Sequence, residues 1–174
     1  MKTTRIIFIF CLMSLGNLVT SQNSNLPDAD IYTLEGIKVN ASGIAGNDRL
    51  TVVLFWNIND LKSLDQLYAT NEANNQLNGK SVKIIGICTD VPGYLQFIKP
   101  YVFGHNIGID IYIDKNNDLK RAMSVPITPY TFLFDQKNDI QAIAMGSCDN
   151  ISEVIEDMLG NDLTSTKDGS KSEN

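Results

Sequence analysis

Short apolar runs rich in β-branched and aromatic residues alternate along this chain with longer segments of helical periodicity. The clearest run, residues 50–56 (Leu-Thr-Val-Val-Leu-Phe-Trp), predicts a buried strand. Asn59 and Asp60 follow it, and both are residue types that favour helix N-caps. The next apolar positions recur at helical spacing and are Leu61, Leu64, Leu67 and Tyr68. The pattern therefore predicts a helix from about Asp60 to Leu77 that ends near the turn pair Asn78-Gly79.

Over its whole length the pattern predicts an α/β domain. A hairpin over residues 31–39 comes first, followed by strand, helix, strand, helix, strand, helix, strand, strand and helix. Lys137-Asn138-Asp139 supplies the turn between the last two strands, and residues 151–159 supply the closing helix. The tail, residues 163–174, has no apolar periodicity and is predicted to be disordered. We expect a single domain over residues 22–162.

The second helix is predicted between Pro92 and Gly104, with Pro100 expected to kink or end it. This is the most aromatic stretch of the chain. Its large apolar residues are Tyr94, Phe97, Ile98, Tyr101, Val102 and Phe103. Two interpretations are open, a helix packed on the sheet or a surface exposed for a partner, and packing on the sheet is the simpler one.

Residues 1–21 have the features of a secretory signal sequence. Lys2 and Arg5 make its start basic, residues 6–15 are apolar, and Val19-Thr20-Ser21 forms the exit. Cleavage is predicted after Ser21, which removes Cys11 together with the signal. No later segment approaches the roughly 20 apolar residues that a membrane span needs. We therefore expect a periplasmic or secreted protein without a membrane span.

The charge of the chain excludes one class of partner. Its formal net charge is −6 at pH 7, and loss of the two basic residues of the signal makes the mature protein more acidic. Such a protein offers no basic stripe to a nucleic-acid backbone, so we expect no nucleic-acid binding.

The junction between the strand over residues 50–56 and the helix after it is a candidate site. Folds often place reactive groups at such junctions, because the first amides of the helix stabilise an anion. Here the junction holds Asp60-Leu61-Lys62-Ser63 and no cysteine. Asp60, Lys62 and Ser63 are open to interpretation as a new polar active site. A helix cap at Asp60 explains the same residues more simply.

Several segments together resemble a known family. They are Leu26-Pro27-Asp28 with the hairpin, Leu54-Phe55-Trp56, residues 82–87 and 109–114, and Val125-Pro126-Ile127-Thr128-Pro129-Tyr130-Thr131-Phe132-Leu133-Phe134-Asp135. In this order they resemble the secreted and periplasmic bacterial thiol-disulfide oxidoreductases of the TlpA/ResA type, which have the thioredoxin fold. The resemblance runs from about Leu26 to Gly160. It implies a three-layer α/β sandwich with a central mixed sheet.

The resemblance also assigns roles to single residues. The family carries a Trp-Cys-x-x-Cys motif after the central strand, and alignment at Trp56 puts Asp60 and Ser63 at the two cysteine positions. It implies that Pro129 is a cis-proline facing the site. In the family the residue before this proline pairs with an extended substrate segment, and Thr128 holds that position here. Trp56, Thr128 and Pro129 are thus the expected binding rim.

Two cysteines remain after signal removal, Cys88 and Cys148. If the family's strand order holds, two strands lie between them, and three steps of about 4.8 Å separate the cysteines by roughly 14 Å. A disulfide needs Cα atoms within about 7 Å, so we expect two free thiols. Cys88 is interpreted as a small buried hydrophobe. Cys148 precedes the last helix, whose amides favour a thiolate, whereas Asp149 and Glu153 oppose one.

Other chemistries lack the residues that they need. The peroxidase branch of the superfamily has a Pro-x-x-x-Thr-x-x-Cys run that residues 56–63 do not match. No Cys/His cluster indicates a metal site, and no Gly-rich loop indicates a phosphate site. His105 is the single histidine, is interpreted as a solvated loop residue, and would be needed for any serine triad. We expect no metal and no cofactor.

These observations lead to two functional hypotheses. The first is a thioredoxin-fold module that has lost dithiol catalysis and binds an extended peptide or a protein, in the manner of a chaperone. The alternative is a redox protein that uses Cys148 or Cys88 singly or with a partner's thiol. The first is preferred, because exchange within one site requires an attacking and a resolving thiol close together. Whether the protein is an enzyme is left open by its sequence.

Overall fold

The computed structural model describes residues 25–45, 48–77, 80–90, 92–148 and 150–165, with side chains as far as residue 160. Its strands and α-helices are β1 (Asp30–Thr33), β2 (Lys38–Asn40), β3 (Leu50–Trp56), α1 (Leu61–Gln76), β4 (Val82–Cys88), α2 (Leu95–Gly104), β5 (Asp110–Ile113), α3 (Asp118–Ala122), β6 (Tyr130–Phe134), β7 (Ile140–Met145) and α4 (Ile151–Ser165). Two short 3-10 helices, Ala41–Gly43 and Pro92–Tyr94, complete the set. The order agrees with the sequence prediction. The expected signal segment and the turn pair at 78–79 lie outside the described residues.

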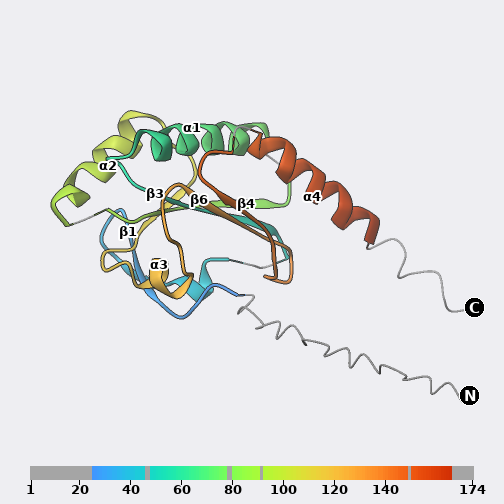
Figure 1. The fold of residues 1–174 in the computed structure, drawn as a ribbon, viewed down its shortest axis with the longest axis horizontal. Helices are drawn as coiled ribbons and strands as arrows, with labels where there is room; N and C mark the ends of the chain where they lie inside the picture. Colours follow the sequence, from blue (N-terminus) through green and yellow to red (C-terminus); the bar gives the residue numbers. More distant parts are fainter. Residues whose placement is uncertain (1–24, 46–47, 78–79, 91, 149, 166–174) are drawn as a thin grey trace, which may run out of the picture.

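Within the described residues, the strands form one mixed sheet in the order β2-β1-β5-β4-β3-β6-β7. β3 lies between β4, which is parallel to it, and β6, which is antiparallel. The hairpin of β1 and β2 joins the sheet through β5. Figure 1 shows α1, α2 and α4 on one side of this sheet and α3 on the other. The expected three-layer α/β sandwich with an N-terminal hairpin is therefore confirmed.

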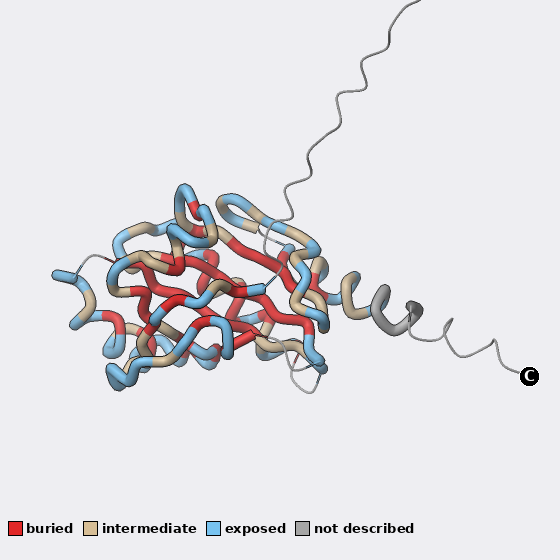
Figure 2. The backbone as a smooth tube through the Cα atoms, turned by 90° about the horizontal axis from the view of Figure 1, so that it is seen from below, coloured by how far each residue is buried: buried red, intermediate tan, exposed pale blue. Residues whose placement is uncertain are grey.

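β3 is buried along its whole length because it has an apolar core on each face. Successive side chains of a strand point to opposite faces. One core lies under α1, α2 and α4 and receives Leu50, Val52, Leu54 and Trp56. The other lies against α3 and the N-terminal segment and receives Val53 and Phe55. Figure 2 shows the resulting buried centre within an exposed outer layer. This two-sided burial explains why residues 50–56 are apolar almost without interruption.

The inner face of α1 is unusually polar. Besides Leu67 and Ala73, it buries Ser63, Gln66, Thr70 and Asn71. Asn71 shows why this is stable: its Oδ1 accepts a hydrogen bond from Gly108 N–H at 2.7 Å, and its Nδ2 donates to Asn106 O at 3.4 Å. Buried polar side chains that satisfy loop backbone groups replace the apolar packing that the sequence of this helix lacks.

α2 packs on the sheet with one face only. Ile98 and Val102 are buried, whereas Tyr94, Phe97 and Phe103 are 42%, 52% and 62% exposed. The packing interpretation therefore holds for the inner face, and the remaining aromatic side chains lie on the surface. Pro100 does not end the helix, which continues to Gly104.

α4 is longer than predicted. Its apolar anchors Ile151 and Ile155 are buried, as the periodicity indicates, but the helix continues to Ser165 instead of ending near Leu159. Residues 163–165, the start of the predicted disordered tail, are thus helical, and residues 166–174 lie outside the described part of the chain. Among the described residues, no helix has the length and apolarity needed to cross a membrane.

Candidate functional site

The candidate site lies at the edge of the sheet where β3 and β4 end and β6 begins. In the ladders, Phe55 pairs with Tyr130, and Trp56 pairs with Cys88. The peptide bond between Thr128 and Pro129 precedes β6 and is cis, as the resemblance implied. The loop from β3 to α1 and the start of β6 therefore share one edge, and the predicted site residues fall in these two segments.

Asp60 caps α1. Its side chain accepts hydrogen bonds from Lys62 N–H at 3.3 Å and Ser63 N–H at 3.2 Å, and Ser63 Oγ–H donates to it at 2.8 Å. The Ser63 side chain is fully buried. Asp60 and Ser63, which the resemblance aligns with the family's cysteines, thus bond to each other, and Asp60 also bonds to the first turn of the helix. The capping interpretation of Asp60 is confirmed.

The backbone of Thr128, directly before the cis-proline, has no hydrogen-bond partner among the described residues. Thr128 is half-buried and Pro129 is buried. In the described part of the chain, neither the N–H nor the C=O of Thr128 has a hydrogen-bond partner, whereas Pro129 O accepts a hydrogen bond from Gly146 N–H at 2.9 Å. Thr128 therefore presents one unpaired donor and one unpaired acceptor at the site edge.

Three exposed apolar side chains occur in the segments that form this edge. Leu61, in the first turn of α1, is 77% exposed, and Ile127, directly before Thr128, is 52% exposed. Met145, which pairs with Tyr130 across β6 and β7, is 64% exposed. None of them was among the binding residues expected from the sequence, although Leu61 lies in the predicted junction. Leu61 recurs at helical spacing with the apolar positions of α1 but lies in its first turn, where it is exposed rather than packed.

Trp56 is not part of the accessible rim, and this corrects the sequence prediction. Its side chain is 0% exposed and belongs to the core under α1, α2 and α4. The indole packs against β4 so closely that a Cβ on Gly86 would lie 3.2 Å from Trp56 Nε1. No hydrogen-bond partner for Nε1 occurs among the described residues. Of the other expected rim residues, Thr128 is half-buried and Pro129 is buried. The exposed apolar side chains at this edge, here called the apolar rim, are Leu61, Ile127 and Met145.

Cys88 is a buried hydrogen-bond donor. Its side chain is 0% exposed, and its thiol donates to Asp90 Oδ2 at 2.9 Å. Burial, followed by the negative charge of Asp90, raises the pKa of the Cys88 thiol well above its ordinary value. A raised pKa disfavours the reactive thiolate, which together with burial supports the structural interpretation of this residue rather than a reactive one.

Cys148 is half-buried and follows β7. Gln66 of α1 fixes its backbone: Gln66 Oε1 accepts from Cys148 N–H at 2.5 Å, and Gln66 Nε2 donates to Cys148 O at 3.4 Å. Cys88 ends β4 and Cys148 follows the end of β7, and β3 and β6 lie between these two strands. The expected strand order is therefore confirmed, and both cysteines are unpaired.

The remaining candidates lie away from this edge. His105 is exposed, and its ring lies 4.3 Å from that of Tyr101. No group of three or more His, Cys, Asp or Glu side chains within the described ranges is arranged to hold a metal ion.

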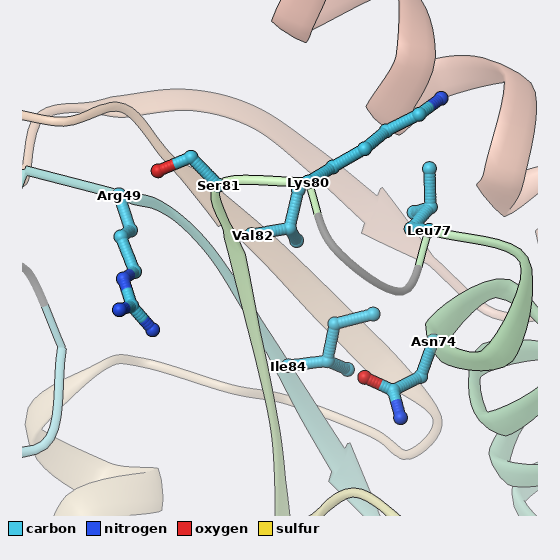
Figure 3. A pocket seen from close by; sticks show the side chains of 7 residues that line it. All are labelled: Arg49, Asn74, Leu77, Lys80, Ser81, Val82 and Ile84. Atoms are coloured by element: carbon cyan, nitrogen blue, oxygen red, sulfur yellow. The ribbon is translucent and has the colours of Figure 1, made fainter.

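A cavity of about 540 Å³ lies at the opposite end of the sheet, where α1 ends and β3 and β4 begin. It is lined by Arg49, Asn74, Leu77, Lys80, Ser81, Val82 and Ile84. Figure 3 shows Lys80 turned away from it toward α4, where its ammonium group pairs with Glu156 at 2.6 Å. This cavity shares no residue with the candidate site.

Comparison with known proteins assigns the family. Residues 23–143 match the model of the AhpC/TSA family. The chain belongs to that family. The expected relationship to thioredoxin-fold redox proteins is thereby confirmed at the level of the redoxin family. No curated protein matches the chain.

Solved structures share the fold. An uncharacterized thioredoxin-like protein from Porphyromonas gingivalis is 23% identical, with a TM-score of 0.66 over 78% of this chain and 90% of that one. The thioredoxin domain of a thiol-disulfide oxidoreductase from Bacteroides vulgatus is 17% identical, with a TM-score of 0.66 over 80% and 98%. StoA from Bacillus subtilis is 17% identical, with a TM-score of 0.60 over 75% and 97%. At these identities the likeness concerns the fold alone.

Proposed function

We propose that this redoxin-family protein is an extracytoplasmic binding module that has lost dithiol exchange and holds extended apolar segments of other polypeptides. The observation that carries the proposal is the unpaired backbone of Thr128 beside the cis-proline, flanked by exposed apolar side chains. An extended segment that pairs with Thr128 gains backbone hydrogen bonds, as an added strand does. The side chains of Ile127, Met145 and Leu61 favour apolar residues in that segment.

Loss of dithiol exchange is supported by the residues at the two cysteine positions. Asp60 and Ser63 carry no thiol, and both are engaged in capping α1. Cys88 lies at the end of β4 and Cys148 lies just after β7, and these two strands are three steps apart in the sheet. Dithiol exchange requires a resolving thiol beside the attacking one, and neither cysteine has such a neighbour in the described structure.

The extracytoplasmic location is proposed from the sequence of residues 1–21. A basic start, an apolar stretch and a cleavage exit direct a protein for export. Expression of the full chain in a bacterial host, followed by N-terminal sequencing of the protein from the periplasm or medium, tests this. A mature N-terminus at Gln22 agrees with export and cleavage after Ser21, whereas full-length protein in the cytoplasm contradicts it.

Binding is tested by titrating the mature protein with S-carboxymethylated insulin B chain, an unfolded apolar polypeptide that has no free thiol. Ile127→Glu and Met145→Glu should each weaken the affinity by roughly tenfold, because each places a charge in the apolar rim. Ile37→Glu is the matched control. Ile37 is 62% exposed on the β1–β2 turn, four strand positions from β6, and its replacement should leave the affinity unchanged. Absence of binding by the natural protein, or equal losses in all three variants, would contradict the proposal.

Loss of exchange is tested by the reduction of insulin with dithiothreitol. The natural protein should not accelerate the reaction, whereas the double variant Asp60→Cys/Ser63→Cys should, because it restores two thiols at a helix N-terminus beside the cis-proline. Turnover by the natural protein would support a second candidate function, single-thiol redox chemistry at Cys148. One observation favours that candidate, namely that Cys148 is partly exposed while Cys88 is buried. In that case Cys148→Ser would abolish the turnover.

A further inference from the structure

Asp90 is a buried carboxylate without a cationic partner in the described part of the chain. It follows β4 by two positions, and its side chain is 0% exposed. The described ion pairs of the chain lie at other residues, on the surface. Burial of a carboxylate costs free energy unless neighbouring donors form hydrogen bonds with it. The groups that donate to Asp90 therefore show which part of the structure it stabilises.

Three donors satisfy this carboxylate, and two of them belong to the candidate site. Asp90 Oδ2 accepts from Ile58 N–H at 2.8 Å, and Asp90 Oδ1 accepts from Asn59 Nδ2 at 3.1 Å. The third donor is the thiol of Cys88, which shares Oδ2. Ile58 and Asn59 form the loop that leads from β3 into Asp60 and the exposed Leu61.

The same loop is fixed at its other side by short-range bonds. Asn57 Oδ1 accepts from Asn59 N–H at 2.8 Å, and Asn57 O accepts from Asp60 N–H at 3.3 Å. Thr89, next to Asp90, donates its N–H and its hydroxyl to Trp56 O at 3.0 and 3.3 Å. The two residues after β4 therefore hold the end of β3 and the start of the site loop against the end of β4.

We infer that Asp90 is a positioning residue for the peptide site, an inference that rests on the proposed function. By fixing Ile58 and Asn59, Asp90 sets where α1 begins relative to Thr128, which lies two residues before β6. It thereby sets the spacing between the exposed side chains of Leu61 and Ile127. A site whose residues are held in place before binding loses less conformational entropy when it binds an extended segment, which strengthens the affinity.

Asp90→Asn tests the inference, because an amide keeps the size of the side chain but replaces one acceptor oxygen with a donor group. The new NH₂ group would face an N–H or S–H donor and could not accept its hydrogen bond. At least one of the hydrogen bonds that fix the loop should therefore be lost. We expect faster hydrogen exchange at the Ile58 amide, NMR shift changes centred on residues 57–62, and roughly tenfold weaker binding of S-carboxymethylated insulin B chain.

Asp114→Asn is the matched control. Asp114 is also 0% exposed and also follows a strand, but its carboxylate accepts from Leu119 N–H at 3.4 Å and Lys120 N–H at 2.8 Å in α3. Asp114→Asn should lower the stability of the protein. It should not change the affinity for S-carboxymethylated insulin B chain or the hydrogen-exchange rate of the Ile58 amide. Equal effects of the two variants on affinity and on Ile58 exchange would overturn the inference.

The two proposals fail separately. If the natural protein does not bind the polypeptide, the proposed function fails, and the exchange rate of the Ile58 amide decides whether Asp90 orders the loop. If the natural protein binds and Asp90→Asn binds equally well, the proposed function stands and the positioning role is wrong.

Discussion

Gln66 holds the backbone of Cys148 by both of its polar groups, although the two residues are 82 positions apart in the chain. The amide oxygen of Gln66 accepts from Cys148 N–H at 2.5 Å, and its amide nitrogen donates to Cys148 O at 3.4 Å. Gln66 is 2% exposed. One buried side chain of α1 thus fixes the connection between β7 and α4, at the same edge as the cis-proline.

Gln66→Leu should therefore destabilise the protein by about 1–3 kcal/mol, because two backbone groups of Cys148 lose their partner inside the protein. Urea denaturation measures the loss. Gln96→Leu serves as the control, since Gln96 lies on the surface and, among the described residues, its side chain bonds only Gly93 O, at 3.4 Å. Its effect should stay within about 0.5 kcal/mol. The connection that carries Cys148 should also loosen in Gln66→Leu, so native-state alkylation of Cys148 should become faster. Equal stability of the two variants would show that the pair is not structural.

Gly86 should be needed for the packing of Trp56. A Cβ at this position would lie 2.6 Å from Ile111 Cδ1 and 3.2 Å from Trp56 Nε1. Gly86→Ala should therefore cost about 1–3 kcal/mol through overpacking and should shift the fluorescence of the single tryptophan. Gly43→Ala is the control, because no atom lies within 4 Å of a Cβ built there. If Gly86→Ala matched this control in stability and emission, the close contact would be wrong.

Element order and element ends were predictable to different degrees. The apolar run 50–56 and the N-cap type of Asp60 located β3 and the start of α1 to the residue, since both signals are local. The same run could not reveal that Trp56 points into a covered core. A strand that is buried on both faces has no alternation in its sequence, so the pattern cannot tell which face each residue takes.

The parts of the site that depend on distant contacts were not predictable. The bonds of Gln66 with Cys148 and of Asp90 with Ile58 join residues far apart in the chain, and local patterns do not show which residues meet. The cis bond at Pro129 was predictable, because the resemblance aligned a specific segment around it. The end of α4 was misjudged, because its last turns carry few apolar residues and the periodicity stops before the helix does.

Cys88 should make the stability of the protein depend on alkaline pH. Burial and the nearby Asp90 raise the pKa of its thiol above the ordinary value of 9.0, so the folded state keeps a proton that the unfolded state releases. A raised pKa in the folded state gives stability that is fully present below the unfolded value and declines as the pH rises above it. Stability should therefore fall from about pH 9 upward.

Cys88→Ser isolates this effect, because serine keeps a donor for Asp90 and does not ionise in the range. Denaturation midpoints measured at intervals from pH 7 to pH 10 should converge for the natural protein and the variant as the pH rises. Parallel curves would mean that the Cys88 thiol is not held protonated. Native-state alkylation at pH 8 provides a second measurement, in which Cys148 should react and buried Cys88 should not.

Asp60 should act as a helix cap and nothing more. Asp60→Ala removes the acceptor of the Lys62 and Ser63 amides and should cost about 1 kcal/mol in the free energy of unfolding. Asp60→Asn and Asp60→Ser keep an acceptor and should be nearly neutral, both in stability and in binding of S-carboxymethylated insulin B chain. Chemical denaturation and the binding titration measure the two quantities on the same samples. A variant Asp60→Asn that stays folded and loses an activity of the natural protein would show instead that the carboxylate performs chemistry and that the site carries out a reaction that needs no cysteine.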